Sequence, residues 1–359
     1  MSSIPLRALV ARRPAEDRVF YHNIWFRGHN NARYAALLPR LPRIDPYLVT
    51  CSERRFVRGL QFRALWRTRA VRNRVVFGTA GRRYRFLFST DPEQIPHFRG
   101  PVVVDVDDPV FTPREAWLLN RPNVRAYVVT SEGAAGHFRE LGVTTPHHVF
   151  PQGVDLATIG EGRREEVGQQ KKRPGEVVIG YMAAWLLTDG DHDGDNQLYN
   201  IDHLLELWGE LHSRLPQARL WLVGEPSRRV RRLCAGRPDI ELLGRLPPGE
   251  ALAHVANFDV ALFCRTRDQG VSTSKVASYM GLGVPTVGYA LGVTRMLDET
   301  GAGVTVTDAR AFVAAVERLA TQPGERARMA AAARAAGRAL DWDELARRYD
   351  AEVLDVHLR

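Results

Sequence analysis

The chain of 359 residues contains little cysteine, almost no lysine and no long apolar run. Its three cysteines, Cys51, Cys234 and Cys264, lie far apart in the sequence. This spacing excludes a zinc site or a disulfide-rich fold and indicates a reducing compartment. No stretch reaches the roughly 18 consecutive apolar residues of a membrane-spanning helix. Arginines interrupt the apolar start of the chain, so we predict no signal peptide and a globular intracellular protein.

Positive charge is concentrated in the first half of the chain. Residues 1–156 contain 24 arginines and 13 acidic residues, whereas the remainder contains 26 basic and 28 acidic residues. Between Arg54 and Arg85, eleven arginines and no acidic residue are interleaved with aromatic side chains. This segment predicts either contact with an anionic membrane surface or lipid phosphate, or a solvated arginine-rich helix. We expect no nucleic-acid partner, because no nucleic-acid-binding module accompanies the charge.

Apolar runs typical of strands alternate with helical stretches along the chain. Strands are expected in the first half at residues 18–26, 46–50, 85–88, 102–106 and 126–130, and a long helix at 53–74. Strands are expected in the second half at 177–182, 219–223, 240–243, 260–264 and 286–289. Such alternation predicts parallel sheets whose two faces are covered by helices.

The composition changes between residues 157 and 175, which are polar and lack apolar periodicity. This is typical of a linker, so we predict a first domain over 1–156, a linker over 157–175 and a second domain over 176–339. Doubly wound sheets bind ligands beyond the carboxyl ends of their strands. A ligand site is therefore expected where the two domains meet.

A polar, glycine-containing loop precedes the helix expected at 274–282. Its residues are Gln269, Gly270, Val271, Ser272, Thr273, Ser274 and Lys275. Backbone amides and the positive end of a helix dipole suit a diphosphate, and Lys275, Arg265 and Arg267 would add charge-assisted contacts. The alternative is an ordinary helix capped by Ser272 or Ser274.

Three separated segments resemble the family-4 glycosyltransferases. Residues 128–155 resemble that family's capped helix, strand and Asn/Gln-Gly-Val-Asp turn, and residues 244–264 resemble the segment that leads into its donor site. Residues 272–288 resemble its donor-binding helix and the Gly-x-Pro entry to the next strand. In addition, the end of the chain at about 340–359 looks like its closing helix. The resemblance implies the GT-B architecture: two facing Rossmann-like, doubly wound α/β domains with an interdomain cleft, and a closing helix that crosses back to the first domain.

The resemblance also implies site residues. Gly244, Arg245 and Leu246 match the segment that contacts the nucleotide base, and Gly28 matches the glycine loop of the first domain. Asp107 stands where the family often has a histidine. The implied catalytic candidates are Asp107, His29 and Lys275. The implied donor-binding residues are Gly28, Asn31, Gly244, Arg245, Leu246, Arg265, Arg267, Asp268, Gln269, Gly270, Val271, Ser272, Thr273, Ser274 and Ser278.

Several positions depart from the family pattern. Ser278 stands where the family has a glutamate that binds the donor ribose, and Gly270 stands where the other glutamate of its pair would be. Ala184 or Trp185 replaces the phosphate-clamping arginine, and Tyr199 replaces the lysine. Donor binding therefore differs from the common scheme or is lost.

Two acidic patterns offer alternative interpretations as metal sites. The sequence 105–107 is similar to the Asp-x-Asp motif of metal-dependent glycosyltransferases, but a carboxylate that orients an acceptor, or a helix cap, is favoured. Residues 189–195 resemble the start of an EF-hand loop, although Asn200 occupies the twelfth position in place of glutamate. A solvated acidic loop is favoured there, and calcium binding stays open.

We therefore predict a glycosyltransferase that moves a sugar from a nucleotide-diphosphate donor to the hydroxyl of a saccharide, a lipid-linked molecule or a natural product. The resemblance implies retention of anomeric configuration without a metal or other cofactor. The alternatives are a non-catalytic binding protein with an eroded donor site and, less favoured, a sugar-nucleotide epimerase. We expect a cytoplasmic location, with the inner face of the membrane as a second location if the arginine segment binds lipid.

Overall fold

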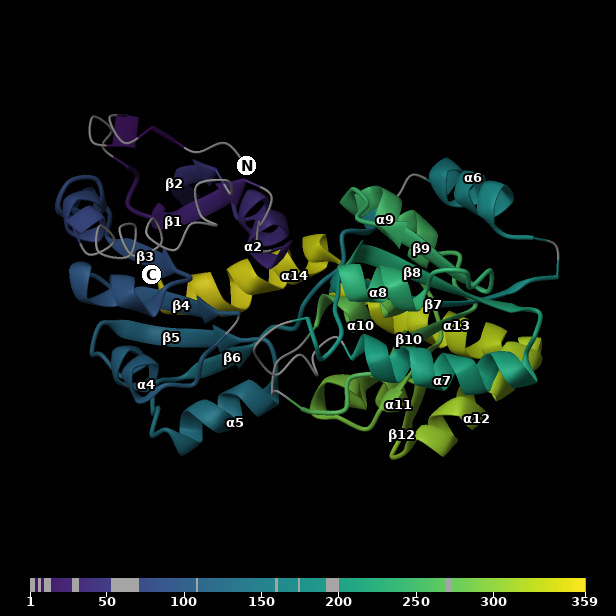
Figure 1. The fold of residues 1–359 in the computed structure, drawn as a ribbon. Helices are drawn as coiled ribbons and strands as arrows, with labels where there is room; N and C mark the ends of the chain where they lie inside the picture. The colour runs from purple at the N-terminus through teal and green to yellow at the C-terminus, as the bar shows by residue number, and fades with distance from the viewer. Residues whose placement is uncertain are drawn as a thin grey trace. The chain divides into compact units, whose positions relative to one another are not determined.

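The computed structural model divides the chain into two compact units, which are described separately (Figure 1). It describes residues 4–5, 8–9, 14–27, 32–52, 71–107, 109–158, 161–173, 175–191, 200–268 and 273–358. The first unit comprises Met1–Pro151 and Trp342–Arg359, and the second comprises Gln152–Asp341. Each contains a six-stranded sheet, and every strand pair is parallel. The prediction of two doubly wound α/β domains is confirmed.

The sheet of the first unit has the strand order β2-β1-β3-β4-β5-β6. Its strands are β1 (Val19–Arg27), β2 (Ile44–Ser52), β3 (Phe86–Ser89), β4 (Val102–Val106), β5 (Val124–Val129) and β6 (His147–Val149). Its main helices are α2 (Ala32–Leu37), α4 (Pro113–Leu119), α5 (Glu132–Glu140) and α14 (Trp342–Tyr349). Ser131 caps α5, and its hydroxyl accepts from the amide of Ala134 at 3.1 Å.

Both faces of this sheet are buried, and the two-residue period of β1 shows how. Val19 and Tyr21 pack into a core cluster with α2 and α14. Phe20, between them, packs from the opposite face against Phe77, with ring centroids 5.8 Å apart. Successive side chains of a strand point to opposite faces, so a continuous apolar run is needed where both faces are covered.

The end of the chain is part of the first unit. Helix α14 contacts α2, so the yellow and purple ends of the chain lie side by side in Figure 1. At their contact the carboxylate of Asp105 on β4 accepts two hydrogen bonds from Arg33, at 3.0 and 2.9 Å. It also accepts from the hydroxyls of Tyr34 and Tyr349 at 3.0 and 2.9 Å. This buried network links β4, α2 and α14.

The sheet of the second unit has the order β12-β11-β10-β7-β8-β9. Its strands are β7 (Val177–Leu186), β8 (Ala218–Pro226), β9 (Ile240–Gly244), β10 (Val260–Phe263), β11 (Thr286–Tyr289) and β12 (Gly303–Val306). Its helices are α6 (Glu161–Lys171), α7 (Ile201–Arg214), α8 (Arg228–Leu233), α9 (Pro248–Val255), α10 (Ser274–Gly281), α11 (Arg295–Thr300), α12 (Ala309–Thr321) and α13 (Pro323–Gly337).

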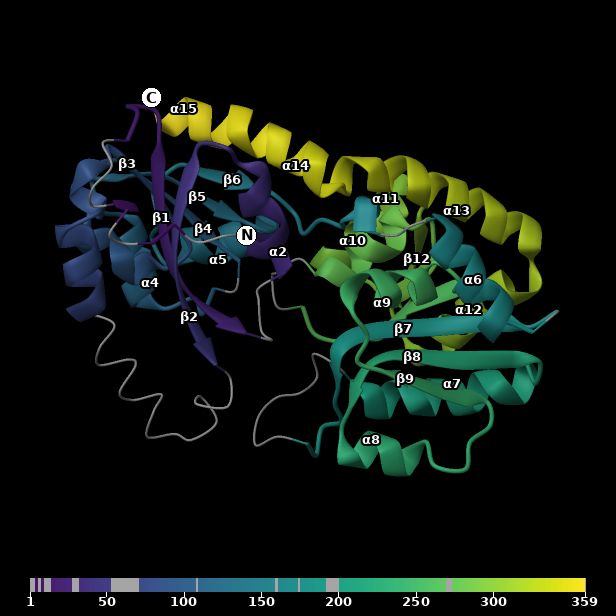
Figure 2. The ribbon, with the colours of Figure 1, turned by 90° about the horizontal axis from the view of Figure 1, so that it is seen from above.

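The helices of the second unit cover opposite faces of its sheet (Figure 2). Leu220 and Leu222 of β8 pack in the cluster that contains α7 and α12. Trp221 and Val223 pack in the other cluster, with α9 and α10. Because both faces of the sheet are covered by apolar side chains, its charged groups lie toward the ends of the strands.

The predicted linker is wrong for residues 161–171, which form helix α6. Val167 is buried, and α6 contacts α9, where the side-chain amide of Asn257 donates to the carbonyl oxygen of Arg164 at 3.0 Å. One buried residue in an otherwise polar helix produces too weak a periodicity to be recognised.

The arginine-rich segment is described only in part. A helix was predicted over 53–74; the structure has a helix over 71–78, and residues 53–70 lie outside the described residues. Among the residues that the structure describes, no helix has both the length and the apolar character needed to cross a membrane.

We predict that Arg33→Met destabilises the first unit by about 3 to 5 kcal/mol, because the buried carboxylate of Asp105 would lose its compensating charge. Urea unfolding followed by circular dichroism measures this loss. Arg40→Met is the matched control, since Arg40 on the neighbouring turn pairs with Asp343, whose side chain is 72% exposed. We expect this control to change the free energy of unfolding by less than about 1 kcal/mol. Equal losses in the two variants would contradict the role assigned to the network.

Candidate functional site

The candidate site of the second unit lies at the carboxyl edge of its sheet. Strands β7, β9, β10 and β11 all end at this edge because they are parallel. Arg245 follows β9, Arg265 follows β10, and Lys275 lies in the first turn of α10, which follows β10 in the chain. The fold therefore brings to one edge basic residues that are up to thirty positions apart.

Lys275 and Arg265 form the electropositive part of this edge. Burial and the positive charge of Arg265 together lower the pKa of Lys275 to about 8. The Nζ atom of Lys275 lies 5.9 Å from the centroid of the Tyr181 ring on β7. Arg265 is only 8% exposed, and its Cζ atom lies 5.5 Å from the centroid of the Phe263 ring. Two cations that repel each other in a partly buried place bind an anion favourably, because the anion offsets their repulsion.

The start of α10 adds backbone donors to the same edge. Thr273 is the N-cap, and its hydroxyl accepts from the amide of Lys275 at 3.4 Å. Ser274 is exposed at the first position of the helix, whereas Ser278 is buried one turn further along. The N-cap of this helix is thus Thr273, and not Ser272 or Ser274 as the alternative interpretation predicted.

A neighbouring loop is fixed by Asp268, whose carboxylate accepts from the amide of Gly292 at 2.5 Å. This bond joins the segment after β10 to the short helix η6 (Gly292–Thr294) after β11. Arg267, beside it, is exposed. One carboxylate oxygen of Asp268 therefore holds the loop after β11 at the carboxyl edge of the sheet.

A third group lies at the end of β9. Gly244 has a φ of +73°, a conformation that favours glycine, and a Cβ atom built there would meet no atom within 4 Å. The guanidinium of Arg245 lies 5.7 Å from the centroid of the half-buried Trp185 ring, which is close enough for a cation–π contact. Leu246 instead packs against the apolar cluster under α9 and α10. Gly244, Arg245 and Trp185 thus form an open, partly aromatic surface.

In the first unit the two aspartates of the Asp-x-Asp pattern have different environments. Asp105 is completely buried, and both of its oxygens accept hydrogen bonds in the network that links β4, α2 and α14. Asp107 directly follows β4 at the carboxyl edge of this sheet and is 8% exposed. Asp105 is committed to the fold, so Asp107 is the candidate for contact with a ligand.

The described part of the chain holds no group of three or more His, Cys, Asp or Glu side chains that could bind a metal ion. In the acidic loop, the carboxylate of Asp191 accepts from the amide and hydroxyl of Thr188 at 2.8 Å and from the hydroxyl of Ser227 at 2.6 Å. Asp191 thus holds the loop to Ser227, the N-cap of α8, and residues 192–195 lie outside the described residues.

Several predicted site residues also lie outside the described residues: Gly28, His29, Asn31, Gln269, Gly270, Val271 and Ser272. Among the described candidates, Lys275, Arg265 and Thr273 come together at one edge, with Arg245 and Gly244 following a neighbouring strand.

The comparison with protein families gives one match. Residues 192–322 match the model described as glycosyl transferases group 1. This segment is therefore similar to the group 1 glycosyl transferases. The match covers α7 to α12 of the second unit and includes the edge at which Lys275 and Arg265 lie. The predicted resemblance and the prediction of a glycosyltransferase are confirmed.

Solved structures show the same fold over nearly the whole chain. HepE from Anabaena, solved in complex with UDP-glucose, is 15% identical with a TM-score of 0.67, and the match covers 94% of this chain and 99% of that chain. Sucrose-phosphate synthase from Thermosynechococcus elongatus is 13% identical with a TM-score of 0.68 and the same two coverages. WaaG, a glycosyltransferase involved in lipopolysaccharide biosynthesis, is 12% identical with a TM-score of 0.65, covering 95% of this chain and 99% of that chain. The predicted GT-B fold is confirmed, and the comparison with curated proteins returned no match.

Three residues near the carboxyl edge of the second unit's sheet were not predicted from the sequence as site residues. Tyr181 lies inside an apolar run, and Trp185 stands out in the sequence only as a departure from the family pattern. Asn200 has a φ of +48°, and its side-chain amide donates to the carbonyl oxygen of Cys264 at 3.1 Å, which joins the start of α7 to the end of β10. Aromatic residues within a strand are a weak signal, because core residues have the same pattern.

We predict that Lys275 titrates near pH 8. Only unprotonated lysine reacts with an acylating reagent, so the reaction rate of Lys275 should level off near this pH, whereas an ordinary lysine levels off near pH 10.4. The exposed Lys171 serves as an internal reference in the same digest, read by mass spectrometry. A Lys275 rate that still rises through pH 10 would contradict the lowered pKa.

Proposed function

We propose that the protein transfers a sugar from a nucleotide-diphosphate sugar to a hydroxyl acceptor, with retention of configuration and without a metal or other cofactor. The observation that carries this proposal is that two cations, Lys275 and Arg265, lie beside each other at the start of α10 in the second unit. A diphosphate supplies the negative charge that this pair attracts. We further propose that the protein acts in the cytoplasm.

In the proposed reaction, the bond between the anomeric carbon and the diphosphate oxygen breaks, and a bond from the acceptor oxygen to the same face of that carbon forms. The acceptor proton passes to an oxygen of the leaving diphosphate, so no protein base is required. Lys275 and Arg265 stabilise the negative charge that develops on the diphosphate. Asp107 orients the acceptor by accepting a hydrogen bond from one of its other hydroxyls. His29 and Asn31 are further candidates in the first unit.

The nucleotide base is assigned to the surface formed by Gly244, Arg245 and Trp185. Trp185 presents a partly exposed ring, and Gly244 leaves open space beside it. Aromatic rings bind bases by stacking, which tolerates different bases. Because HepE was solved with UDP-glucose, a donor panel for this protein begins with UDP-glucose and UDP.

We expect calorimetric titration with UDP, UDP-glucose and other nucleoside diphosphates to identify at least one ligand. Lys275→Ala should weaken its binding by about tenfold or more, because a charge-assisted contact to phosphate is lost. Lys171→Ala, which removes an exposed lysine that pairs with Glu241 on the same domain, should leave the affinity unchanged.

The alternative, a non-catalytic binding protein with an eroded donor site, predicts the opposite result in this experiment. The absence of a carboxylate at Ser278 is the observation that favours it. If no nucleotide binds, or if Lys275→Ala binds as tightly as the parent protein, the proposed transfer is wrong and a binding role for the fold is supported.

For Asp107→Asn, we expect kcat to fall by about a hundredfold, since an amide accepts from a hydroxyl less well than a carboxylate and orients the acceptor less well. The affinity for the nucleotide should stay within about twofold, because Asp107 is assigned to the acceptor and not to the donor. Glu140→Gln, at a side chain that is 79% exposed, is the control. Sugar transfer and nucleotide binding are measured on the same preparations, and a loss of nucleotide binding in Asp107→Asn would remove Asp107 from the acceptor side.

A further inference from the structure

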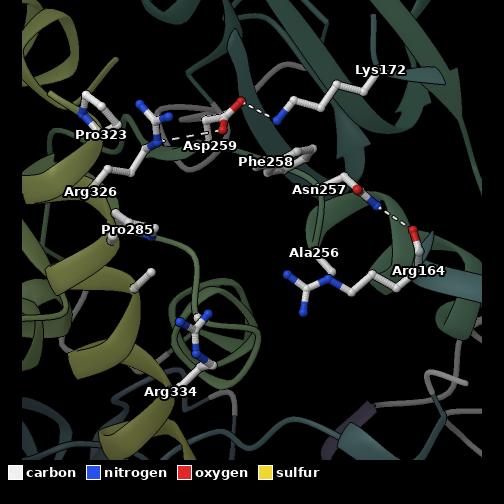
Figure 3. A pocket seen from close by; sticks show the side chains of 13 residues that line it. Arg164, Lys172, Ala256, Asn257, Phe258, Asp259, Pro285, Pro323, Arg326 and Arg334 are labelled. Carbon is white, nitrogen blue, oxygen red and sulfur yellow. Dashed lines mark hydrogen bonds and ion pairs between the residues drawn. The ribbon is translucent and has the colours of Figure 1, made fainter. Parts of the chain in front are cut away.

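A cavity of the second unit lies at the opposite edge of its sheet from Lys275. It has a volume of about 360 Å³, within the range of small-molecule sites (Figure 3). Residues 256–259 precede β10, Gly283 and Pro285 precede β11, and Lys172 follows α6 and precedes β7. The cavity therefore lies at the amino ends of the central strands, whereas Lys275 lies at their carboxyl ends.

Positive charge dominates the lining of this cavity. Four cations contribute to it, namely Arg164 of α6, Lys172, and Arg326 and Arg334 of α13. Asp259 is the one acidic residue among the lining residues that the structure describes. The lining thus carries a net charge of about +3 at neutral pH, which predicts an anionic ligand.

Asp259 neutralises one end of the cavity only. Its carboxylate accepts from Lys172 Nζ at 2.6 Å and from the amide of Val178 at 2.8 Å, and it lies 3.7 Å from Arg326 Nε. Arg326 also donates to the carbonyl oxygens of Leu319 and Ala320 at 2.9 and 3.0 Å. Lys172 and Arg326 are therefore held in place and form a rigid side of the cavity.

Arg164 and Arg334 provide the remaining charge. Both are exposed, and Figure 3 shows their guanidinium groups extending into the cavity from different walls. No described carboxylate lies within 4.0 Å of either side chain. Gly283 has a φ of +70°, and a Cβ atom there would lie 2.4 Å from Arg334 Cγ, so this glycine lets the arginine lie across the turn before β11.

The shape of α13 leaves room between its two arginines. Ala327 and Ala330 line the cavity between Arg326 and Arg334, and their small side chains leave the volume open. Phe258 and Pro285 add apolar surface. A ligand with an anionic group for the guanidiniums and an uncharged part for the apolar surface fits this lining.

We propose that this cavity binds a small phosphate monoester, whose phosphate lies between Arg164 and Arg334. Guanidinium groups bind phosphate through paired, charge-assisted hydrogen bonds, and two of them from different helices match its tetrahedral oxygens. The site is separate from the Lys275 edge and does not depend on the proposed sugar transfer.

Calorimetric titration of the full chain tests the proposal with ribose 5-phosphate, inorganic phosphate and ribose as probes. We expect saturable binding of ribose 5-phosphate and no binding of ribose. Inorganic phosphate that binds as tightly as the ester shows that the phosphate alone is recognised, whereas weaker binding shows that the ester's organic part contributes. The double variant Arg164→Gln/Arg334→Gln should lower the affinity for ribose 5-phosphate by about tenfold or more.

Two control proteins show whether the ester binds in this cavity or elsewhere on the chain. Arg328→Gln/Arg338→Gln removes the same charge from exposed residues of α13 and the turn after it that do not line the cavity, and should keep the parent affinity. Lys275→Ala should also bind ribose 5-phosphate with the parent affinity, which distinguishes this cavity from the proposed donor site. The proposal is overturned if ribose 5-phosphate does not bind at millimolar concentration, if the Arg164/Arg334 variant binds it normally, or if either control loses it equally.

Discussion

Burial of both faces of each parallel sheet is the constraint on which the rest of this structure depends. In β4 all five residues are buried, and in β8 neighbouring side chains pack into clusters on opposite faces. Charged side chains are costly within such strands unless they are paired, as Asp105 is. The charged side chains of the two candidate sites therefore lie beyond the ends of the strands. Lys275 and Arg265 lie at the carboxyl edge of the second sheet, and Arg164 and Arg334 lie at its amino edge.

The same constraint explains how much of the fold could be predicted from the sequence. Strands buried on both faces appear as continuous apolar runs, so β4, β5, β7, β8 and β10 could all be located. Helix α6 could not, because it buries little more than Val167 and its polar composition resembles that of a linker. Sequence patterns detect burial, and an element that buries one side chain produces almost no pattern.

The candidate site was predictable only in part. Lys275 was identified because a glycine-containing loop opens its helix, and Arg265 because it follows an apolar strand. The ring of Tyr181 beside Lys275 and the contact of Arg245 with Trp185 depend on strand order, and β7 lies beside β10 although more than seventy residues separate them. Asp105 and Asp107 look equivalent in the sequence, yet one is bonded within the core and the other lies beyond the strand.

The return of α14 to the first unit has a consequence for biosynthesis. Tyr349 donates to Asp105 in the buried network, and Trp342 and Leu345 complete the apolar cluster over β1, β3 and β4. These residues are translated after the entire second unit has been made. The first unit, which leaves the ribosome before the second, is thus completed after it, and the growing chain must keep an unfinished apolar surface from aggregating until α14 has been made.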